Sequence, residues 1–193
     1  MKSQVTTHYG DGGMTRSLGG DRVPKSHPVM EAVGALDAFR AQLCLLRLAL
    51  LEKPGGGHAA EAECLWWLLH VCFLMGAEIS DPLKKHPEWR RGEVGGGHLK
   101  KLEAEQARLE GMTPLPRAFV VSAANTTAAL ADIAATSART FERRLVALKE
   151  AEPGFDAEGL FAFVNRLSDY LFILARHLDG GEHQTVDYGA AAP

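Results

Sequence analysis

Apolar residues recur at every third or fourth position through most of this 193-residue chain. A helix turns once every 3.6 residues, so this spacing places such residues on one helical face. We interpret the face as core rather than as a binding surface, because helices of globular proteins bury a stripe of this kind. The pattern is clearest near the C-terminus, where the stripe consists of Phe161, Val164, Leu167, Leu171, Leu174 and Leu178.

Five segments carry this helical pattern, and none of the chain is a convincing strand. Proline and glycine separate the segments, as at Lys53-Pro54 and Pro153-Gly154. Asp156 is the expected N-cap of the last helix, and Gly180-Gly181 is its expected stop. The sequence predicts an all-α, five-helix up-and-down bundle. The expected helices cover residues 29–53, 59–79, 99–109, 126–149 and 156–178.

The two ends of the chain lack this periodicity. Residues 1–28 are polar and glycine-punctuated, which predicts a long glycine-rich N-terminal loop before the bundle domain of residues 29–179. A loop of this length in a compact domain is usually functional or disordered. Residues 180–193 are expected to form a disordered tail.

Composition excludes several classes of protein. The chain has 21 Lys and Arg against 24 Asp and Glu, a net charge of -3, whereas nucleic-acid binding depends on surplus cations. The longest apolar stretch, residues 64–77, is short for a bilayer span and is interrupted by His70, so no membrane partner is expected. The N-terminus has no apolar secretion signal. Cys44, Cys64 and Cys72 lie in apolar helical surroundings and are expected to be buried thiols of a cytoplasmic protein.

A Gly-Gly-Gly-His sequence occurs at residues 55–58 and again at 95–98. We interpret the pair as two loop-to-helix junctions rather than as a metal site. No CxxC motif is present and no further ligands follow at helical spacing, so no metal-ligating set is expected.

Two of the expected helices carry polar residues that a bundle does not need. Arg139, Glu142 and Arg143 stand at i, i+3 and i+4. These residues could form a solvated face with helix ion pairs, each worth about 0.2–0.5 kcal/mol. They could equally form an anion site in which arginines hold phosphate oxygens. Spacing alone leaves both interpretations open. A similar polar row on the last helix consists of Asn165, Asp169, Phe172 and Arg176.

The glycine cluster in the N-terminal loop favours the anion site. Residues 9–15 read Tyr-Gly-Asp-Gly-Gly-Met-Thr, which offers unhindered backbone N–H groups and a hydroxyl, the ingredients of a phosphate cradle. The cluster is not a Walker A motif, because no Gly-Lys-Ser/Thr follows it.

Taken in order, six motifs resemble those of the PduO-type ATP:cob(I)alamin adenosyltransferases over about residues 5–179. The most specific is Asn-Arg-Leu-Ser-Asp-Tyr-Leu-Phe at residues 165–172, close to that family's Asn-Arg-Leu-Ser-Asp-x-Leu-Phe. The other five motifs lie at residues 7–15, 20–25, 31–37, 119–121 and 139–143.

The resemblance implies a five-helix bundle that assembles as a homotrimer with active sites at subunit interfaces. It also implies transfer of the 5′-deoxyadenosyl group of ATP to cob(I)alamin, giving adenosylcobalamin and triphosphate. ATP and Mg²⁺ would be required, and the corrinoid would be the second substrate. Further partners implied in this way are a flavoprotein reductase or a cobalamin-dependent enzyme.

The family's functional residues carry over to matching positions of this chain. Residues 1–28 would be a nucleotide-binding loop, with the triphosphate and its Mg²⁺ held by Thr7, Gly10, Thr15 and Lys25. The same loop would contribute His8, Tyr9 and Arg16. The helices would hold the nucleotide through Arg139, Glu142, Arg143 and Asn165. Three residues would serve catalysis: Arg139, Phe119 against the corrin face, and Asp37 through an interface contact.

Several positions depart from the family pattern. Ala135 and Thr140 stand where the family has arginines, and His8 stands where it has a lysine. Arg40 either restores a cation near the site or is a solvated helix residue. These departures motivate an alternative to the enzyme: a non-catalytic relative that binds a corrinoid, another tetrapyrrole or a nucleotide as a carrier or sensor.

Overall fold

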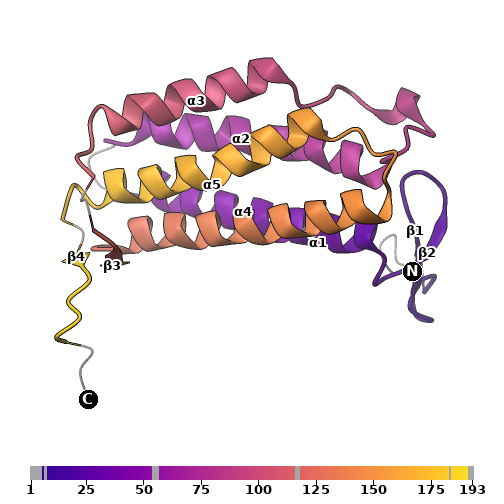
Figure 1. Cartoon of the computed structure of the whole chain (residues 1–193), viewed down its shortest axis with the longest axis horizontal. Coiled ribbons are helices and arrows are strands. Elements are labelled where there is room, and N and C mark those ends of the chain that lie inside the picture. The colour runs from indigo at the N-terminus through magenta and orange to yellow at the C-terminus, as the bar shows by residue number, and fades with distance from the viewer. Residues whose placement is uncertain (1–5, 7, 54–56, 116–117, 183, 191–193) are drawn as a thin grey trace.

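The computed structural model describes residues 6, 8–53, 57–115, 118–182 and 184–190. Within these ranges five long helices run in alternating directions (Figure 1), which confirms the predicted up-and-down bundle. A short 3₁₀ turn, Pro87–Trp89, precedes the third helix. The helices are α1 Pro28–Leu51, α2 Ala59–Ser80, α3 Gly96–Glu110, α4 Thr126–Ala151 and α5 Glu158–Leu178.

Side chains and proline fix where the helices begin. At α1 the His27 ring accepts the Val29 N–H at 3.3 Å, and Pro28 occupies the first helical position, where its missing N–H costs nothing. Asn125 caps α4 by accepting the Ala128 N–H at 3.0 Å. The predicted cap of α5 is wrong by one residue: Ala157, not Asp156, holds that position. Ala157 is buried in the core, whereas Asp156 is exposed.

The helices bury their apolar faces in one common core. Helix α4 packs between α1 and α5, while α2 covers α1 and α3 covers α5. The predicted α5 stripe is buried, except that Phe161 is only partly covered. Small side chains on α4 allow its neighbours to approach closely. The buried alanines of α4 are Ala128, Ala131, Ala134, Ala135 and Ala138.

Helix α2 is the most apolar element. Its 22 residues reach a mean hydropathy of 1.4, which by length and composition alone would suffice to cross a membrane. Half of that stretch is buried within the bundle, so α2 packs as a core helix here. Cys64 and Cys72 lie on its buried face as expected. Cys44 on α1 was also expected to be buried, and this expectation is wrong: the residue follows the inward-facing Leu43, points away from the core and is exposed.

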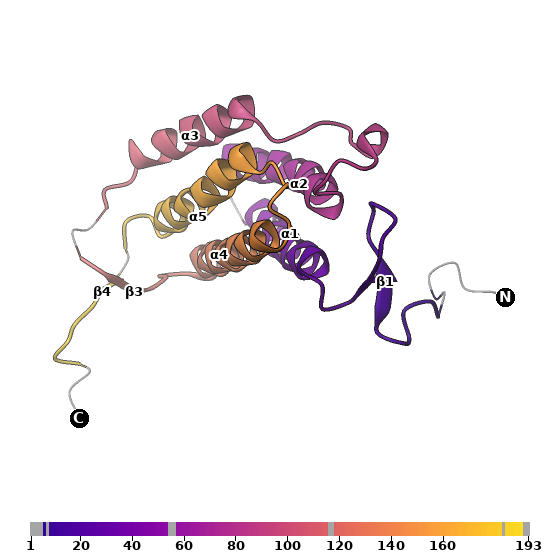
Figure 2. The ribbon, with the colours of Figure 1, turned by 45° about the vertical axis from the view of Figure 1, so that its right-hand side comes forward.

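Four short strands escaped the sequence prediction. Strands β1 (Met14–Arg16) and β2 (Arg22–Pro24) form an antiparallel hairpin at one end of the bundle (Figures 1 and 2). At the other end β3 (Val120–Ser122) pairs with β4 (Gln184–Thr185). The expectation of a disordered tail over residues 180–193 is therefore wrong for residues 184–186, which pair with the chain ahead of α4.

Candidate functional site

The outer faces of α4 and α5 carry two neighbouring pockets, which we call the α4–α5 flank. A pocket of about 250 Å³ lies against β3 and is lined by Ala135, Arg139, Phe172 and Arg176, among others. A second pocket of about 350 Å³ is lined by Glu142 and Asn165 together with residues of α3 and α5. Arg139 and Glu142 are one turn apart on α4, so polar groups from both helices converge on this flank.

Three of the predicted ligand-binding side chains on the flank have no partner of their own. Arg139, Glu142 and Asn165 make no side-chain hydrogen bond or ion pair with any residue that the structure describes. The helix ion pair that Arg139 and Glu142 could have formed is therefore not made. Their charges and amide group face solvent and remain available to a ligand.

Arg143 lies apart from these three residues. Its guanidinium donates to Thr140 Oγ1 at 3.0 Å, and its side chain lines neither pocket of the flank. The family resemblance implied that Arg143 holds the nucleotide; its side chain does not line the two pockets of the flank.

Arg176 differs from Arg139 in being almost fully buried. It donates to Asp132 Oδ2 at 2.7 Å, and its Nε lies 2.9 Å from Asp179 Oδ2, an ion pair without the alignment of a hydrogen bond. Asp179 in turn accepts the Ala124 N–H at 2.7 Å. This buried network ties the end of α5 to α4 and to the segment that follows β3, so it holds the first pocket in shape.

Aromatic and aliphatic side chains border the same pocket. Phe119 precedes β3 and is 79% exposed, and Val121 and Phe172 are also exposed. The Phe119 carbonyl accepts the Val186 N–H at 2.9 Å, so the C-terminal segment fixes the backbone that carries this ring. The predicted corrin-contacting phenylalanine thus stands beside the flank on an exposed apolar surface.

The N-terminal loop brings Lys25 over Gly10. A Cβ atom on Gly10 would lie 2.9 Å from Lys25 Nζ, so a side chain at this position would push the end of the lysine out of its place. The Lys25 N–H donates to the Gly13 carbonyl at 2.9 Å, which closes the loop on the hairpin. The ammonium group therefore lies against the glycine-rich backbone that was expected to cradle phosphate.

The remaining loop residues form local pairs. Arg16 Nε donates to the Tyr9 hydroxyl at 3.1 Å, and this hydrogen bond lowers the pKa of Tyr9. His8 adopts a left-handed backbone conformation and lies 3.1 Å from Asp11. Thr15 belongs to β1 and is partly buried, while Thr7 lies outside the described residues.

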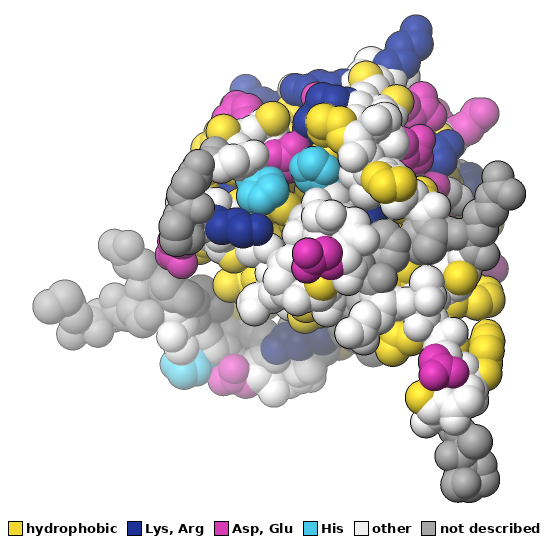
Figure 3. Space-filling model, turned by 90° about the vertical axis from the view of Figure 1, so that its left-hand side faces the viewer, with side chains coloured by type: hydrophobic (Ala, Val, Ile, Leu, Met, Phe, Trp, Pro, Cys, Tyr) yellow, Lys and Arg dark blue, Asp and Glu magenta, His cyan; other side chains and the backbone are white. Residues whose placement is uncertain are grey.

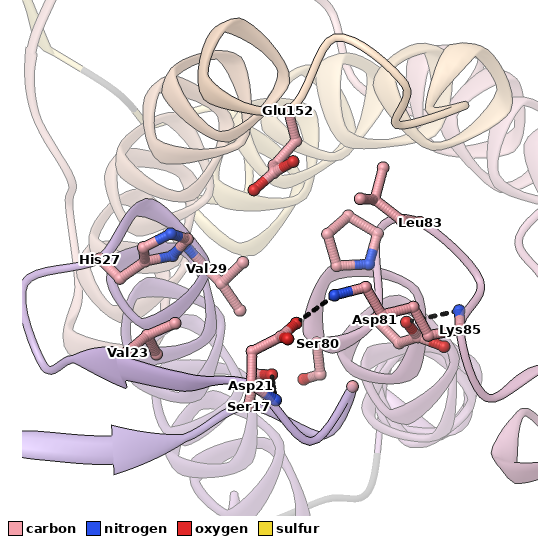
Figure 4. Close-up of a pocket in the computed structure, with 12 residues that line it drawn as sticks. Ser17, Asp21, Val23, His27, Val29, Ser80, Asp81, Leu83, Lys85 and Glu152 are labelled. Carbon is pink, nitrogen blue, oxygen red and sulfur yellow. Dashed lines mark hydrogen bonds and ion pairs between the residues drawn. The ribbon is translucent and has the colours of Figure 1, made fainter.

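A pocket of about 260 Å³ separates the hairpin from the bundle (Figure 4). Lys85 bridges to Asp21 at 2.6 Å, and Asp81 accepts the Lys85 N–H at 2.9 Å. A Cβ atom on Gly19 would lie 3.2 Å from Asp81 Oδ1, which explains the glycine at this close approach. The pocket has more negative side chains than positive ones, because Lys85 is lined up against Asp21, Asp81 and Glu152. Its charge therefore suits anchoring the hairpin rather than holding triphosphate.

Asp37 lies on another face of the molecule. Arg40 Nη2 donates to its carboxylate at 3.0 Å, and the same guanidinium stacks over the Phe73 ring at 5.0 Å. These three residues line a shallow groove between α1 and α2. Arg40 therefore neutralises Asp37 within the chain rather than adding a cation to the α4–α5 flank.

The hairpin and the flank occupy separate places on one chain (Figure 2). Among the described residues, no hydrogen bond or ion pair joins the loop residues 8–25 to Arg139, Glu142 or Asn165. The sequence predicted both halves of the site, but a single chain does not bring them together. The hairpin's anchor at Asp81 and Lys85 escaped prediction, because in sequence both residues lie in the segment that follows the expected helix over residues 59–79 and nothing local relates them to Asp21.

Comparisons with known proteins give matches over nearly the whole chain. Residues 5–178 match the family model for cobalamin adenosyltransferase. The corrinoid adenosyltransferase PduO of Salmonella typhimurium is 32% identical over 180 residues, which are 93% of this chain and 51% of that protein. The chain thus spans about half the length of such relatives. The cobalamin adenosyltransferase of Cupriavidus metallidurans is 32% identical over 92% of this chain and 89% of its own length.

Solved structures share the fold. A variant of the PduO-type ATP:corrinoid adenosyltransferase of Lactobacillus reuteri, complexed with cobalamin and ATP, superposes with a TM-score of 0.83 at 22% identity. That match covers 95% of this chain and 98% of the other. The family model spans nearly the whole chain, and its motif residues Arg139, Glu142 and Asn165 converge on one flank. This chain is a member of the cobalamin adenosyltransferase family.

Proposed function

We propose that this protein transfers the 5′-deoxyadenosyl group of ATP to cob(I)alamin, releasing triphosphate and forming adenosylcobalamin. The observation that carries the proposal is the α4–α5 flank, where Arg139, Glu142 and Asn165 converge without side-chain partners in the described part of the chain. The relatives named corrinoid adenosyltransferases, and the similar structure that holds cobalamin and ATP, support the choice of substrates.

In this reaction the electron pair of cobalt(I) attacks C5′ of ATP. A cobalt–carbon bond forms while the C5′–O bond breaks, and the bonding electrons leave with triphosphate. The corrinoid substrate is itself the nucleophile, so the chain needs no activated side chain. Its contribution is to align the two substrates and to stabilise the charge that develops on the leaving group.

Cations and backbone donors on this chain suit the leaving triphosphate. Lys25 over the glycine loop and the unpaired Arg139 supply positive charge, and Asn165 supplies an amide donor. Glu142 accepts a hydrogen bond from the nucleotide. The assignments of Thr7, His8, Tyr9, Thr15, Arg16 and Arg143 to the same site remain predictions.

Magnesium would arrive with ATP. Mg²⁺ is commonly held by substrate phosphates and one or two carboxylates, with water completing its shell. Asp11 fits that role, because its carboxylate is exposed beside Gly10 and, among the described residues, contacts the His8 ring at 3.1 Å and no cationic lysine or arginine. Bound there, the ion would neutralise charge on the triphosphate.

An exposed apolar surface suits the corrin ring. Val121 and Phe172 line the first pocket, and Phe119 directly precedes the pocket residue Val120; all three side chains are exposed, so a broad macrocycle could cover them. Phe119 would press on the corrin face next to cobalt and exclude an axial ligand there.

A complete site requires a second chain under this proposal. The loop and the flank lie apart on one chain, so the loop of one subunit would close over the flank of its neighbour in a homotrimer (Figure 2). The outer face of α1 and α2 has the apolar character of an interface: Leu45, Leu48, Trp66 and Phe73 are all exposed there. Asp37, in the groove beside Phe73, would lie in that contact.

The direct test is to incubate the full chain with MgATP and chemically reduced cob(I)alamin and to follow adenosylcobalamin by its absorbance. Product above the uncatalysed background is expected, and Asn165→Ala should remove ATP binding while the helical circular dichroism is kept. Unchanged ATP affinity in that variant would exclude Asn165 from the site.

A second function has one observation in its favour. Ala135 lines the first pocket and Thr140 lies on the same helix, so two positions near Arg139 lack a cation. A carrier or sensor that binds a corrinoid, another tetrapyrrole or a nucleotide would not need these charges. Corrinoid binding without any product would favour that function. A faster reaction in Ala135→Arg would show instead that the enzyme is active but slowed at this position.

A further inference from the structure

A cluster of two histidines and a glutamate lies at the end of the bundle remote from the hairpin. His58 immediately precedes α2, Glu61 is in the first turn of α2, and His177 is in the last turn of α5. Figure 3 looks onto this end of the molecule, where two histidine side chains lie next to each other at the surface. None of the three residues belongs to the α4–α5 flank or to the N-terminal loop.

The ligand atoms of the cluster are within reach of one metal ion. One atom from each residue can be chosen so that all three lie within 4.8 Å of one another. His58 Nδ1 is 3.7 Å from Glu61 Oε2, and His177 Nε2 is 3.7 Å from Glu61 Oε1. These two distances run to different oxygens of Glu61, whereas the ligand atoms of tetrahedral zinc stand about 3.3–3.5 Å apart, so the three side chains would draw together by about 1 Å around one ion.

Hydrogen bonds to residues outside the cluster orient two of the three ligands. His177 Nδ1 lies 3.2 Å from Thr113 Oγ1, which can accept a hydrogen bond from Nδ1–H and leave Nε2 free to bind a metal. Arg108 Nη2 donates to Glu61 Oε1 at 3.0 Å, which leaves Oε2 facing the cluster. Hydrogen-bonded histidines and carboxylates of this kind are typical of metal sites.

His58 supplies an atom without a partner. Its Nδ1 is buried and makes no hydrogen bond to the described part of the chain, although it faces the Glu61 carboxylate. The ring edges of His58 and His177 meet at right angles, with centroids 5.9 Å apart. Lys53 Nζ lies 3.4 Å from His58 Nε2. Binding through Nδ1 would place a proton on Nε2, so the flexible lysine would turn towards solvent.

We propose that His58, Glu61 and His177 bind one divalent transition-metal ion, with zinc as the best match. Two imidazole nitrogens and one carboxylate oxygen form a zinc ligand set, whereas Mg²⁺ and Ca²⁺ prefer oxygen alone. A water molecule fills the fourth position on the solvent side. The ion links the start of α2 to the end of α5, so it stabilises this end of the bundle.

The competing explanation is an ion-paired network that needs no metal. Glu61 already pairs with Arg108, and Lys53 adds a second positive charge next to His58. Both positive charges would repel a divalent ion if the cluster were only an ion-paired network. A direct metal titration therefore separates the two explanations, because only a metal site binds the ion in a saturable way.

The experiment uses the untagged full chain, stripped of metal with EDTA and then freed of the chelator. Zn²⁺ is titrated by calorimetry, and Co²⁺ is added to a second sample because its visible absorption distinguishes tetrahedral from octahedral coordination. We expect one saturable Zn²⁺ site per chain, a tetrahedral Co²⁺ spectrum and a higher melting temperature with Zn²⁺. No saturable Zn²⁺ binding, or an octahedral Co²⁺ spectrum, would overturn the proposal.

Variants connect the binding to these residues. His177→Gln should weaken Zn²⁺ binding at least about 100-fold, and Thr113→Val about 10-fold through loss of the outer contact. His70→Gln is the matched control, because His70 is an exposed histidine of α2 bonded only to the Trp66 carbonyl. Its affinity should equal that of the unaltered chain. If His177→Gln loses its helical circular dichroism, His58→Gln is measured in its place, because His58 precedes α2 and its substitution should disturb the helices less. Wild-type affinity in the folded variant would overturn the assignment.

Discussion

Two arginines of the same flank show how environment decides the role of a residue. Arg139 is exposed and unpaired among the described residues, so its guanidinium can exchange water for phosphate oxygens. Arg176 is buried and already neutralised by Asp132 and Asp179. Removing one member of a buried ion pair leaves a desolvated charge, whereas an exposed pair contributes little. Arg176 is therefore a stabilising residue and Arg139 a ligand-binding one.

Arg176→Met should lower the free energy of unfolding by about 3–5 kcal/mol, because it leaves the Asp179 carboxylate buried without its partner. Arg144→Met is the control: Arg144 and Glu31 form an exposed pair at 3.5 Å, and its loss should cost less than about 1 kcal/mol. Urea unfolding followed by circular dichroism measures both. Equal losses in the two variants would contradict the assignment.

The three thiols should differ sharply in reactivity. Burial raises the pKa of Cys64 to about 11 and that of Cys72 to about 12, while Cys44 is exposed. The thiolate is the reactive form, so raised pKa values keep both α2 thiols protonated and inert at pH 8. A thiol-reactive disulfide reagent should modify at most one cysteine, Cys44, rapidly in the native protein and all three in guanidinium chloride. Three equal rates in the native chain would show that α2 is not buried as described.

Sequence could predict the residues of the flank but not which of them are buried. Asn165, Glu142 and Arg139 follow from helical spacing and from the motifs that resemble the family. Spacing also grouped Arg176 with the polar row of α5. Its burial depends on Asp132, 44 residues away, and no local pattern relates the two.

At the scale of elements, long periodic segments were predictable and short paired ones were not. Each helix was found to within three residues at either end, because its apolar stripe repeats over many turns. The strands of the hairpin have three residues each, too few for an alternating pattern to stand out. Strand β4 pairs with β3 from more than 60 residues away, and only tertiary structure brings them together. The strands that the sequence did not predict adjoin two candidate site residues: β2 ends directly before Lys25, and β3 begins directly after Phe119.

The glycine loop offers a matched pair of substitutions. Gly10→Ala would drive a Cβ atom against Lys25 Nζ and displace the ammonium, whereas Gly12→Ala meets nothing within 4 Å. Displacement of a positioned cation by about 1 Å can cost about 10²-fold in rate. Gly10→Ala should therefore raise the KM for MgATP or lower kcat by at least about tenfold with an unchanged melting temperature. Gly12→Ala should behave as the unaltered chain. Equal kinetics in both variants would remove Lys25 from the triphosphate site.

At the scale of the whole molecule, the bundle holds the two halves of its site apart. The hairpin is anchored at the end where α1 begins, and the flank runs along α4 and α5 (Figures 1 and 2). A rigid bundle cannot fold back to bring Lys25 to Asn165. A cyclic assembly can, because a head-to-tail interface places one patch of each subunit against a different patch of the next. Such a contact repeated around a threefold axis closes into a ring with equivalent sites.

This geometry predicts complementation between two inactive variants. Lys25→Ala keeps an intact flank, and Asn165→Ala keeps an intact loop. In a trimer that contains both variants, about one interface in three would join an intact loop to an intact flank. Co-expressed chains, purified through two different tags so that only mixed trimers remain, should therefore regain about a third of the unaltered activity, although each variant alone is inactive.

Sedimentation of the purified mixture provides the check on assembly, with a trimeric mass expected for the unaltered chain and for both variants. A monomeric mass, or a trimer whose mixed form stays as inactive as its parents, would mean that loop and flank act within one chain. In that case Lys25 would have to reach Arg139 and Asn165 by a movement of the hairpin away from Asp81 and Lys85. Lys85→Met breaks the ion pair to Asp21 that anchors the hairpin, so in that case it should alter the KM for MgATP of the single chain. If the site is composite, Lys85→Met should leave unchanged the fraction of activity that the mixed trimers regain.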